Sequence, residues 1–172
     1  MNVTGNIFTG FRDDPANNRL LRFAGIHLFR SPISNVTISG NLVADMVSSY
    51  ESDTAATGLG ISVMESNTNV VIENNTVADI TGWRDDGIGF AGAKTADTAV
   101  IRGNRIANVI TQNEGGGVFF EHAGTGCTIE NNIVTDSTCG VDCETGTGAT
   151  VVNNTLYAND RGIVVSGTDN TV

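Results

Sequence analysis

An internal repeat constrains the fold of this chain more than any other feature of its sequence. An eight-residue unit with alternating apolar residues occurs at 36–43, 70–77, 99–106, 127–134 and 149–156, and a partial copy opens the chain at 3–8. Between the copies lies a second unit, a glycine followed by alternating apolar residues. Both units alternate with period two, which is typical of short β-strands. Because the two units return together along the whole chain, we expect a solenoid in which each repeat forms one coil. The second unit begins at Gly25, Gly60, Gly87, Gly117, Gly140 and Gly162.

Each copy of the first unit contains an asparagine preceded by glycine or asparagine. These are the residue types that enter the left-handed backbone region at least cost, so we predict a left-handed turn at every copy. The asparagine that follows would stack on its counterpart in the next coil, about 4.8 Å away, and form a hydrogen-bonded ladder. Four residues later comes a weaker polar column, Asp45, Asp79, Asn108 and Asp136, which we expect to hold the next loop by local bonds. The predicted ladder consists of Asn6, Asn41, Asn75, Asn104, Asn132 and Asn154.

The repeated Val-x-Ile-x-Gly/Asn-Asn-x-Val and Gly-Ile-x-Val units resemble those of right-handed parallel β-helix proteins, which include pectate lyases, polygalacturonases, alginate epimerases and phage tailspikes. The resemblance implies an all-β, single-stranded right-handed parallel β-helix of about six coils, with three short parallel sheets and an internal asparagine ladder. Gly-Ile-x-Val would form the first sheet, Val-x-Ile the second and Asn-x-Val the third. A leucine-rich repeat needs several leucines per repeat, whereas the chain has six in all.

Residues 1–172 are expected to form one β-helix domain. Neither end has the sequence of a cap, so we expect the chain to be an excerpt of a longer protein, or a partner chain to stack on its ends. The net charge of −10, with Lys94 as the single lysine, argues against nucleic acid as a partner. The sequence shows no membrane span and no signal peptide. The three cysteines, Cys127, Cys139 and Cys143, are interpreted as small core residues.

One candidate site lies on the outward face of the first sheet. By the alternation, Glu121 should lie beside Glu144 on the next coil, with Asp142 on the same strand as Glu144 and His122 just past the strand end. Carboxyls on neighbouring coils, about 5 Å apart, could form a retaining glycosidase pair or share a proton as an acid and base. Glu121, Asp142 and Glu144 could equally bind Ca²⁺. The plainest interpretation is a solvated acidic stripe.

A second candidate is the segment from Trp83 to Asp86. Its Asp85-Asp86 pair resembles the Asp-Asp segment of polygalacturonases, in which carboxylates act as acid and water-activating base. The neighbouring coils lack that family's Asn-Thr-Asp and Gly-His-Gly elements, which weakens the comparison. Trp83 could stack on a sugar ring or cover the apolar end of its loop. In the carbohydrate-active β-helix enzymes that the chain resembles, the substrate groove lies along the first sheet. Arg84 and Arg161 are the basic residues expected near this groove.

The resemblance implies an extracellular or cell-surface protein that acts on a polysaccharide as a lyase, hydrolase or epimerase, or that binds a glycan. Because the groove has few cations, a polyanionic substrate would require a metal, and a neutral glycan is otherwise favoured. The alternative is a noncatalytic adhesion or tailspike segment that stacks or oligomerises. The predicted acids, bases or calcium ligands are Asp85, Asp86, Glu121, Asp142 and Glu144, and the predicted substrate-binding residues are Trp83, Arg84, His122 and Arg161.

Overall fold

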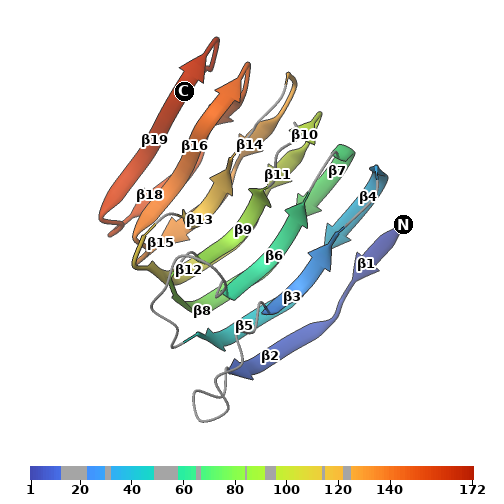
Figure 1. Ribbon diagram of the computed structural model, residues 1–172, viewed down its shortest axis with the longest axis vertical. Coiled ribbons are helices and arrows are strands. Elements are labelled where there is room, and N and C mark those ends of the chain that lie inside the picture. Colours follow the sequence, from blue (N-terminus) through green and yellow to red (C-terminus); the bar gives the residue numbers. More distant parts are fainter. Residues whose placement is uncertain are drawn as a thin grey trace.

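The chain winds into six stacked coils of parallel strands, as the computed structural model shows in Figure 1. Each complete coil contributes one strand to each of three sheets, here called sheets A, B and C, and every strand pair is parallel. Within the described residues all regular elements are strands. The predicted β-helix with three parallel sheets is therefore confirmed. The described residues are 1–12, 23–29, 32–48, 58–64, 67–83, 85–91, 96–113, 115–121 and 125–172.

The three sheets correspond to the repeated units. Sheet A contains the Val-x-Ile units: β1 (Asn2–Thr4), β4 (Ile33–Ser39), β7 (Asn67–Glu73), β11 (Val100–Arg102), β14 (Thr128–Glu130) and β17 (Thr150–Val152), with the short β10 (Ala96–Asp97) beside β7. Sheet B contains the Asn-x-Val units: β2 (Ile7–Arg12), β5 (Leu42–Val47), β8 (Thr76–Gly82), β12 (Arg105–Thr111), β15 (Ile133–Thr135) and β18 (Thr155–Tyr157). Sheet C contains the Gly-Ile-x-Val units: β3 (Phe23–Leu28), β6 (Gly58–Met64), β9 (Asp85–Ala91), β13 (Gly115–Phe120), β16 (Cys139–Thr147) and β19 (Arg161–Thr168).

Each coil bends at three residues with positive φ, and these residues stack into three columns. Their φ angles lie between 53° and 86°. The first column confirms the predicted left-handed turn in all six copies, whereas the third column was not predicted. The first column is Gly5, Gly40, Asn74, Gly103, Asn131 and Asn153; the second is Gly10, Asp45, Asp79, Asn108, Asp136 and Ala158; the third is Asn35, Asn69, Thr98, Gly126, Gly148 and Asp169.

The predicted asparagine ladder follows the first column. Asn104 shows its geometry: its Oδ1 accepts hydrogen bonds from the main-chain N and the Nδ2 of Asn75, at 2.9 and 3.0 Å. Its Nδ2 donates to Oδ1 of Asn132 and to the carbonyl of Ile72, both at 3.0 Å. Asn104 is 1% exposed. The same pattern links Asn6 to Asn154, so the ladder joins all six coils.

The core is the column of inward side chains between the three sheets. Ile38, Ile72 and Ile101 of sheet A and Ile61 and Ile88 of sheet C are fully buried, as the alternation predicts. The rings of Phe90 and Phe120 stack with their centroids 4.6 Å apart. In the last coil the inward residues Ile163 and Val165 are 38% and 36% exposed, because no further coil covers them in this structure.

The glycines that open the Gly-Ile-x-Val units of sheet C lie where backbone and core approach each other closely. A Cβ on Gly60 would lie 2.3 Å from the carbonyl oxygen of Gly87 and 2.6 Å from Cγ1 of Val77 in sheet B. Gly117 faces Val134 in the same way, with Cγ1 at 2.3 Å. These glycines let sheet C pack directly against the side chains of sheet B.

The part of the chain that the structure describes contains no helix that could span a membrane.

Candidate functional site

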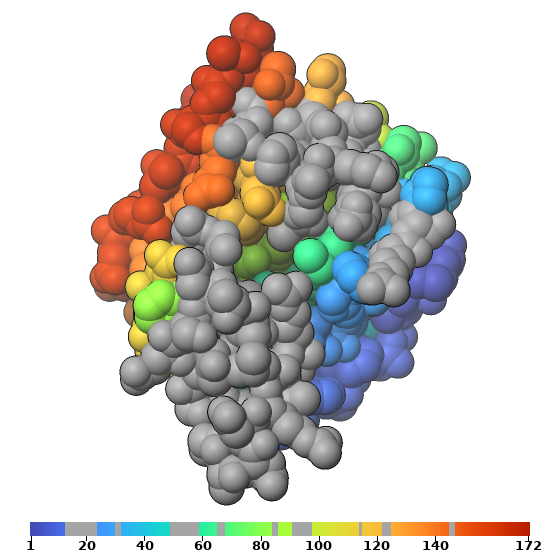
Figure 2. Space-filling model, viewed as in Figure 1, coloured from blue at the N-terminus to red at the C-terminus, as the bar shows by residue number. Residues whose placement is uncertain are grey.

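The outward positions of sheet C form one continuous line of residues across the coils. Strand pairing places His27, Ser62, Gly89, Phe119, Asp142 and Val164 side by side, one on each coil. We call this line the outer row. Its central members are buried although they point away from the core: Ser62 is 1% exposed, and Phe119 and Asp142 are each 5% exposed. Figure 2 shows the described atoms of the central coils on this side of the molecule.

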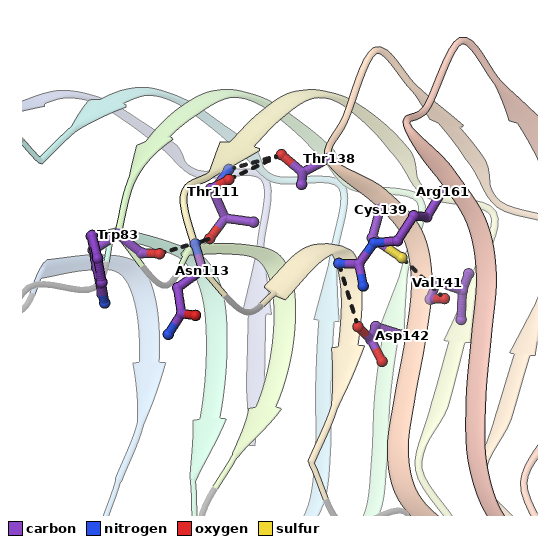
Figure 3. Close-up of polar contacts among 8 residues, drawn as sticks. All are labelled: Trp83, Thr111, Asn113, Thr138, Cys139, Val141, Asp142 and Arg161. Carbon is purple, nitrogen blue, oxygen red and sulfur yellow. Dashed lines mark hydrogen bonds and ion pairs between the residues drawn. The ribbon is translucent and has the colours of Figure 1, made fainter. Parts of the chain in front are cut away.

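Asp142 is a buried carboxylate held on β16 beside Arg161 of β19. Its Oδ2 lies 3.9 Å from a guanidinium nitrogen of Arg161, as Figure 3 shows. Its Oδ1 is buried and has no hydrogen-bond partner among the described residues. Burial raises the pKa of Asp142 above the usual value of 3.8, and Arg161 opposes this rise. A carboxyl in such surroundings keeps its proton at a higher pH than an exposed one.

Two buried thiols lie close to Asp142. Burial, reinforced by the negative charge of Asp142, raises the pKa of Cys139 to about 11. The same two causes raise the pKa of Cys143 to about 12. All three cysteines are free thiols and buried. A buried thiol with a raised pKa keeps its proton at neutral pH, which agrees with the interpretation of Cys139 and Cys143 as small core residues.

Glu121 and Glu144 lie on neighbouring coils, as the alternation predicts. The paired residues Phe120 and Cys143 immediately precede them, and both glutamates are half-buried. In the described part of the chain, no three His, Cys, Asp or Glu side chains are grouped so that they could hold a metal ion. Asp142 faces the cation of Arg161 instead. The calcium site expected at Glu121, Asp142 and Glu144 stays a prediction, and we derive no step through a metal.

Asp86 is the one member of the Trp83–Asp86 segment whose side chain has a defined place on the outer face. It lies on β9, is 5% exposed, and its carboxylate folds over Gly89. Asp85 begins the same strand, but its side chain lies outside the described residues, as do Arg84 and His122. Of the predicted site residues, Asp86, Glu121, Asp142, Glu144 and Arg161 thus all belong to sheet C or its margin.

Trp83 lies at the corner between sheets B and C. Its carbonyl accepts hydrogen bonds from Oγ1 of Thr111 and the main-chain N of Asn113, both at 2.9 Å. Its Nε1 is buried and has no partner among the described residues. Thr111 in turn donates its main-chain N–H to Oγ1 of Thr138 at 3.0 Å, so this corner ties three coils together (Figure 3). The main-chain carbonyl of Trp83 therefore helps to fix the corner just before β9 begins.

Comparison with known proteins supports the fold. The family model described as right handed beta helix region matches residues 1–172. No curated protein and no solved structure matches the chain.

Proposed function

The chain belongs to the right-handed β-helix family, and from this premise we propose that it binds a polysaccharide along the outer face of sheet C and hydrolyses its glycosidic bonds. The observation that carries this proposal is Asp142, a buried carboxylate on the outer row, one of whose oxygens has no hydrogen-bond partner among the described residues. Because one fold serves many functions, the family alone does not supply the activity, and the chemistry of the site must carry the proposal.

Asp142 suits the role of proton donor to a glycosidic oxygen. A general acid works best when its pKa lies near the working pH, which for a carboxyl requires a raised pKa. Burial acts on the pKa of Asp142 in this direction. Arg161, at 3.9 Å, is close enough to orient the carboxyl and too far to form a tight ion pair with it.

Hydrolysis fits the described residues better than elimination or epimerisation of a uronic acid polymer. Those reactions require that the uronate carboxylate be neutralised, by a metal or by several cations. The described outer face of sheet C carries Asp86, Asp142, Glu121 and Glu144 but the single cation Arg161. Paired carboxyls are the groups that glycoside hydrolysis needs.

The experiment is a comparison of two aspartate variants on a panel of neutral and anionic polysaccharides. New reducing ends would report hydrolysis and unsaturated uronates would report elimination, with and without added calcium. We expect reducing ends without unsaturated products, and a loss of about 100-fold or more in Asp142→Asn. Asp136→Asn is the matched control, because Asp136 is exposed at a corner outside sheet C.

Three results would contradict the proposal. If the wild-type protein binds a glycan but releases no product from any polymer, the outer face is a binding surface without turnover. If Asp142→Asn cleaves as fast as Asp136→Asn, the proton comes from another group. Unsaturated products that depend on calcium would replace hydrolysis by elimination.

A further inference from the structure

The outer row of sheet C has one position without a side chain. Ser62, Phe119 and Asp142 project from their strands, whereas Gly89 leaves a gap between Ser62 and Phe119. Gly89 does not have positive φ, so its backbone does not require glycine. The reason for glycine must therefore lie in what occupies the space above it.

The carboxylate of Asp86 occupies this gap. A Cβ on Gly89 would lie 2.4 Å from Oδ2 of Asp86 and 3.0 Å from both its Cγ and its Cβ. No other described side chain approaches that position as closely. The carboxylate of Asp86 therefore takes the Gly89 position in the outer row. Phe119 lies between this buried carboxylate and the buried Asp142.

We propose that Asp86 is the second catalytic carboxylate of the site and that Gly89 is the positioning residue that holds it there. This inference rests on the proposed hydrolysis. Gly89 and Asp142 lie on strands two apart, so about 10 Å separates their backbones at about 4.8 Å per strand. A separation of this order leaves room for a water molecule between a carboxylate and the sugar, as inverting hydrolysis requires.

Hydrolysis of the glycosidic bond then needs only the polysaccharide, one water molecule and these two carboxyl groups. The water oxygen forms a bond to the anomeric carbon while the carboxylate of Asp86 takes one of its protons. The bond from the anomeric carbon to the glycosidic oxygen breaks, and Asp142 gives its proton to that oxygen. The products are a new reducing end of inverted configuration and a free hydroxyl.

The competing pair is Glu121 and Glu144. They lie on adjacent strands, about 5 Å apart in the backbone, which is the spacing of a retaining pair. The configuration of the first product therefore distinguishes the two pairs. NMR of the reducing end during early cleavage should show inversion, and retention would overturn the assignment of Asp86.

Kinetics of Asp86→Asn provide the second test. We expect a rate loss of about 100-fold or more with substrate binding retained, and Asp136→Asn again serves as the control. If the wild-type protein cleaves a glycan and Asp86→Asn cleaves it equally well, the inference fails while the proposed function stands. If no polymer is cleaved by the wild-type protein, the proposed function fails and takes the catalytic role with it.

The positioning role has its own test, which needs no substrate. Gly89→Ala should lower the melting temperature by several degrees in the wild-type background and by much less in Asp86→Ala, where the carboxylate is gone. If Gly89→Ala alone does not fold, the double variant should recover the fold. Gly162→Ala is the control, because a Cβ there would meet nothing within 4 Å. Equal effects of Gly89→Ala in both backgrounds would refute the positioning role.

Discussion

At the scale of single residues, the corners of each coil depend on backbone conformations that most side chains avoid. Gly103 has φ of 63°, and Asn74 and Asn131, its counterparts on the neighbouring coils, have φ of 55° and 56°. Asparagine and glycine accept such angles at low cost, whereas β-branched residues do not. The chain therefore alternates freely between these two residue types at the first corner.

The choice of residue at this corner can be tested directly. Gly103→Val should lower the melting temperature clearly, because valine is strained at positive φ. Gly103→Asn should be nearly neutral, since the nearest atom to its new Cβ is Oδ1 of Asn74, at 2.7 Å, the mobile end of a side chain. Thermal melts of both variants give the comparison. Equal melting temperatures would contradict the left-handed turn.

The ladder residue that follows should be far less tolerant. Asn104→Leu removes the side-chain bonds that Asn104 makes with Asn75 and Asn132, and the main-chain N of Asn75 loses its acceptor in a buried column. We expect a loss of about 1–3 kcal/mol in the free energy of unfolding, measured by denaturant titration. Asn2→Leu, at an exposed position of β1, should change it little. A loss of similar size in both variants would argue against the ladder.

Sequence reasoning predicts the first corner because its residue types are limited to two. The second corner accepts Asp45 and Ala158, and what its members share is the left-handed backbone rather than a common side-chain bond. The third corner accepts Thr98, which no turn preference suggests. At these corners the stacking of coils imposes positive φ angles that the local sequence does not predict.

At the scale of elements, sheet C packs closely against sheet B because its glycines have no side chains. Gly60, Gly87 and Gly117 admit the core side chains of sheet B and the carbonyls of the next strand. The repeat shows that glycine recurs here, but only the structure gives the reason. Conversely, the alternation predicts which residues of sheet C point outward. It distinguishes only the two faces of a strand, so it does not predict that Phe119 and Asp142 are buried.

Glycine in this column should be nearly irreplaceable within the stack. In Gly60→Ala the new Cβ would overlap the carbonyl of Gly87, which belongs to the backbone and cannot turn aside. Overpacking of this kind costs about 1–3 kcal/mol or more, and denaturant titration should show the loss. Gly162→Ala, at the open end of the same column, should leave the unfolding free energy nearly unchanged. A tolerated Gly60→Ala would mean that the sheets are less tightly packed.

At the scale of the whole molecule, the burial of Asp142 makes the stability of the folded state depend on pH. Burial raises the pKa of Asp142, so the folded protein binds a proton more tightly than the unfolded chain does. As the pH rises above the usual value for aspartate and through the raised value, the unfolded state loses that proton more readily, and stability falls. The contribution of Asp142 therefore favours the folded state least at neutral pH.

This linkage predicts opposite effects of one substitution on stability and on activity. Asp142→Asn should raise the melting temperature at pH 7 and leave it nearly unchanged at pH 3, where the carboxyl is protonated in both states. The same variant should lose the proposed hydrolysis. Melting curves across this pH range test the point. A variant less stable than wild type at pH 7 would indicate that Asp142 is stabilised as a charged group.

The stacking of coils also makes the mechanical resistance of the molecule depend on the direction of the applied force. Within a coil, consecutive strands follow one another by covalent bonds, whereas the coils are held to each other by rows of hydrogen bonds that run along the axis of the helix. A force along the axis would load these bonds one coil at a time and peel the structure open. A force across the axis would load all the bonds between two coils together. The protein should therefore yield easily to traction at its ends and resist shear across its flank.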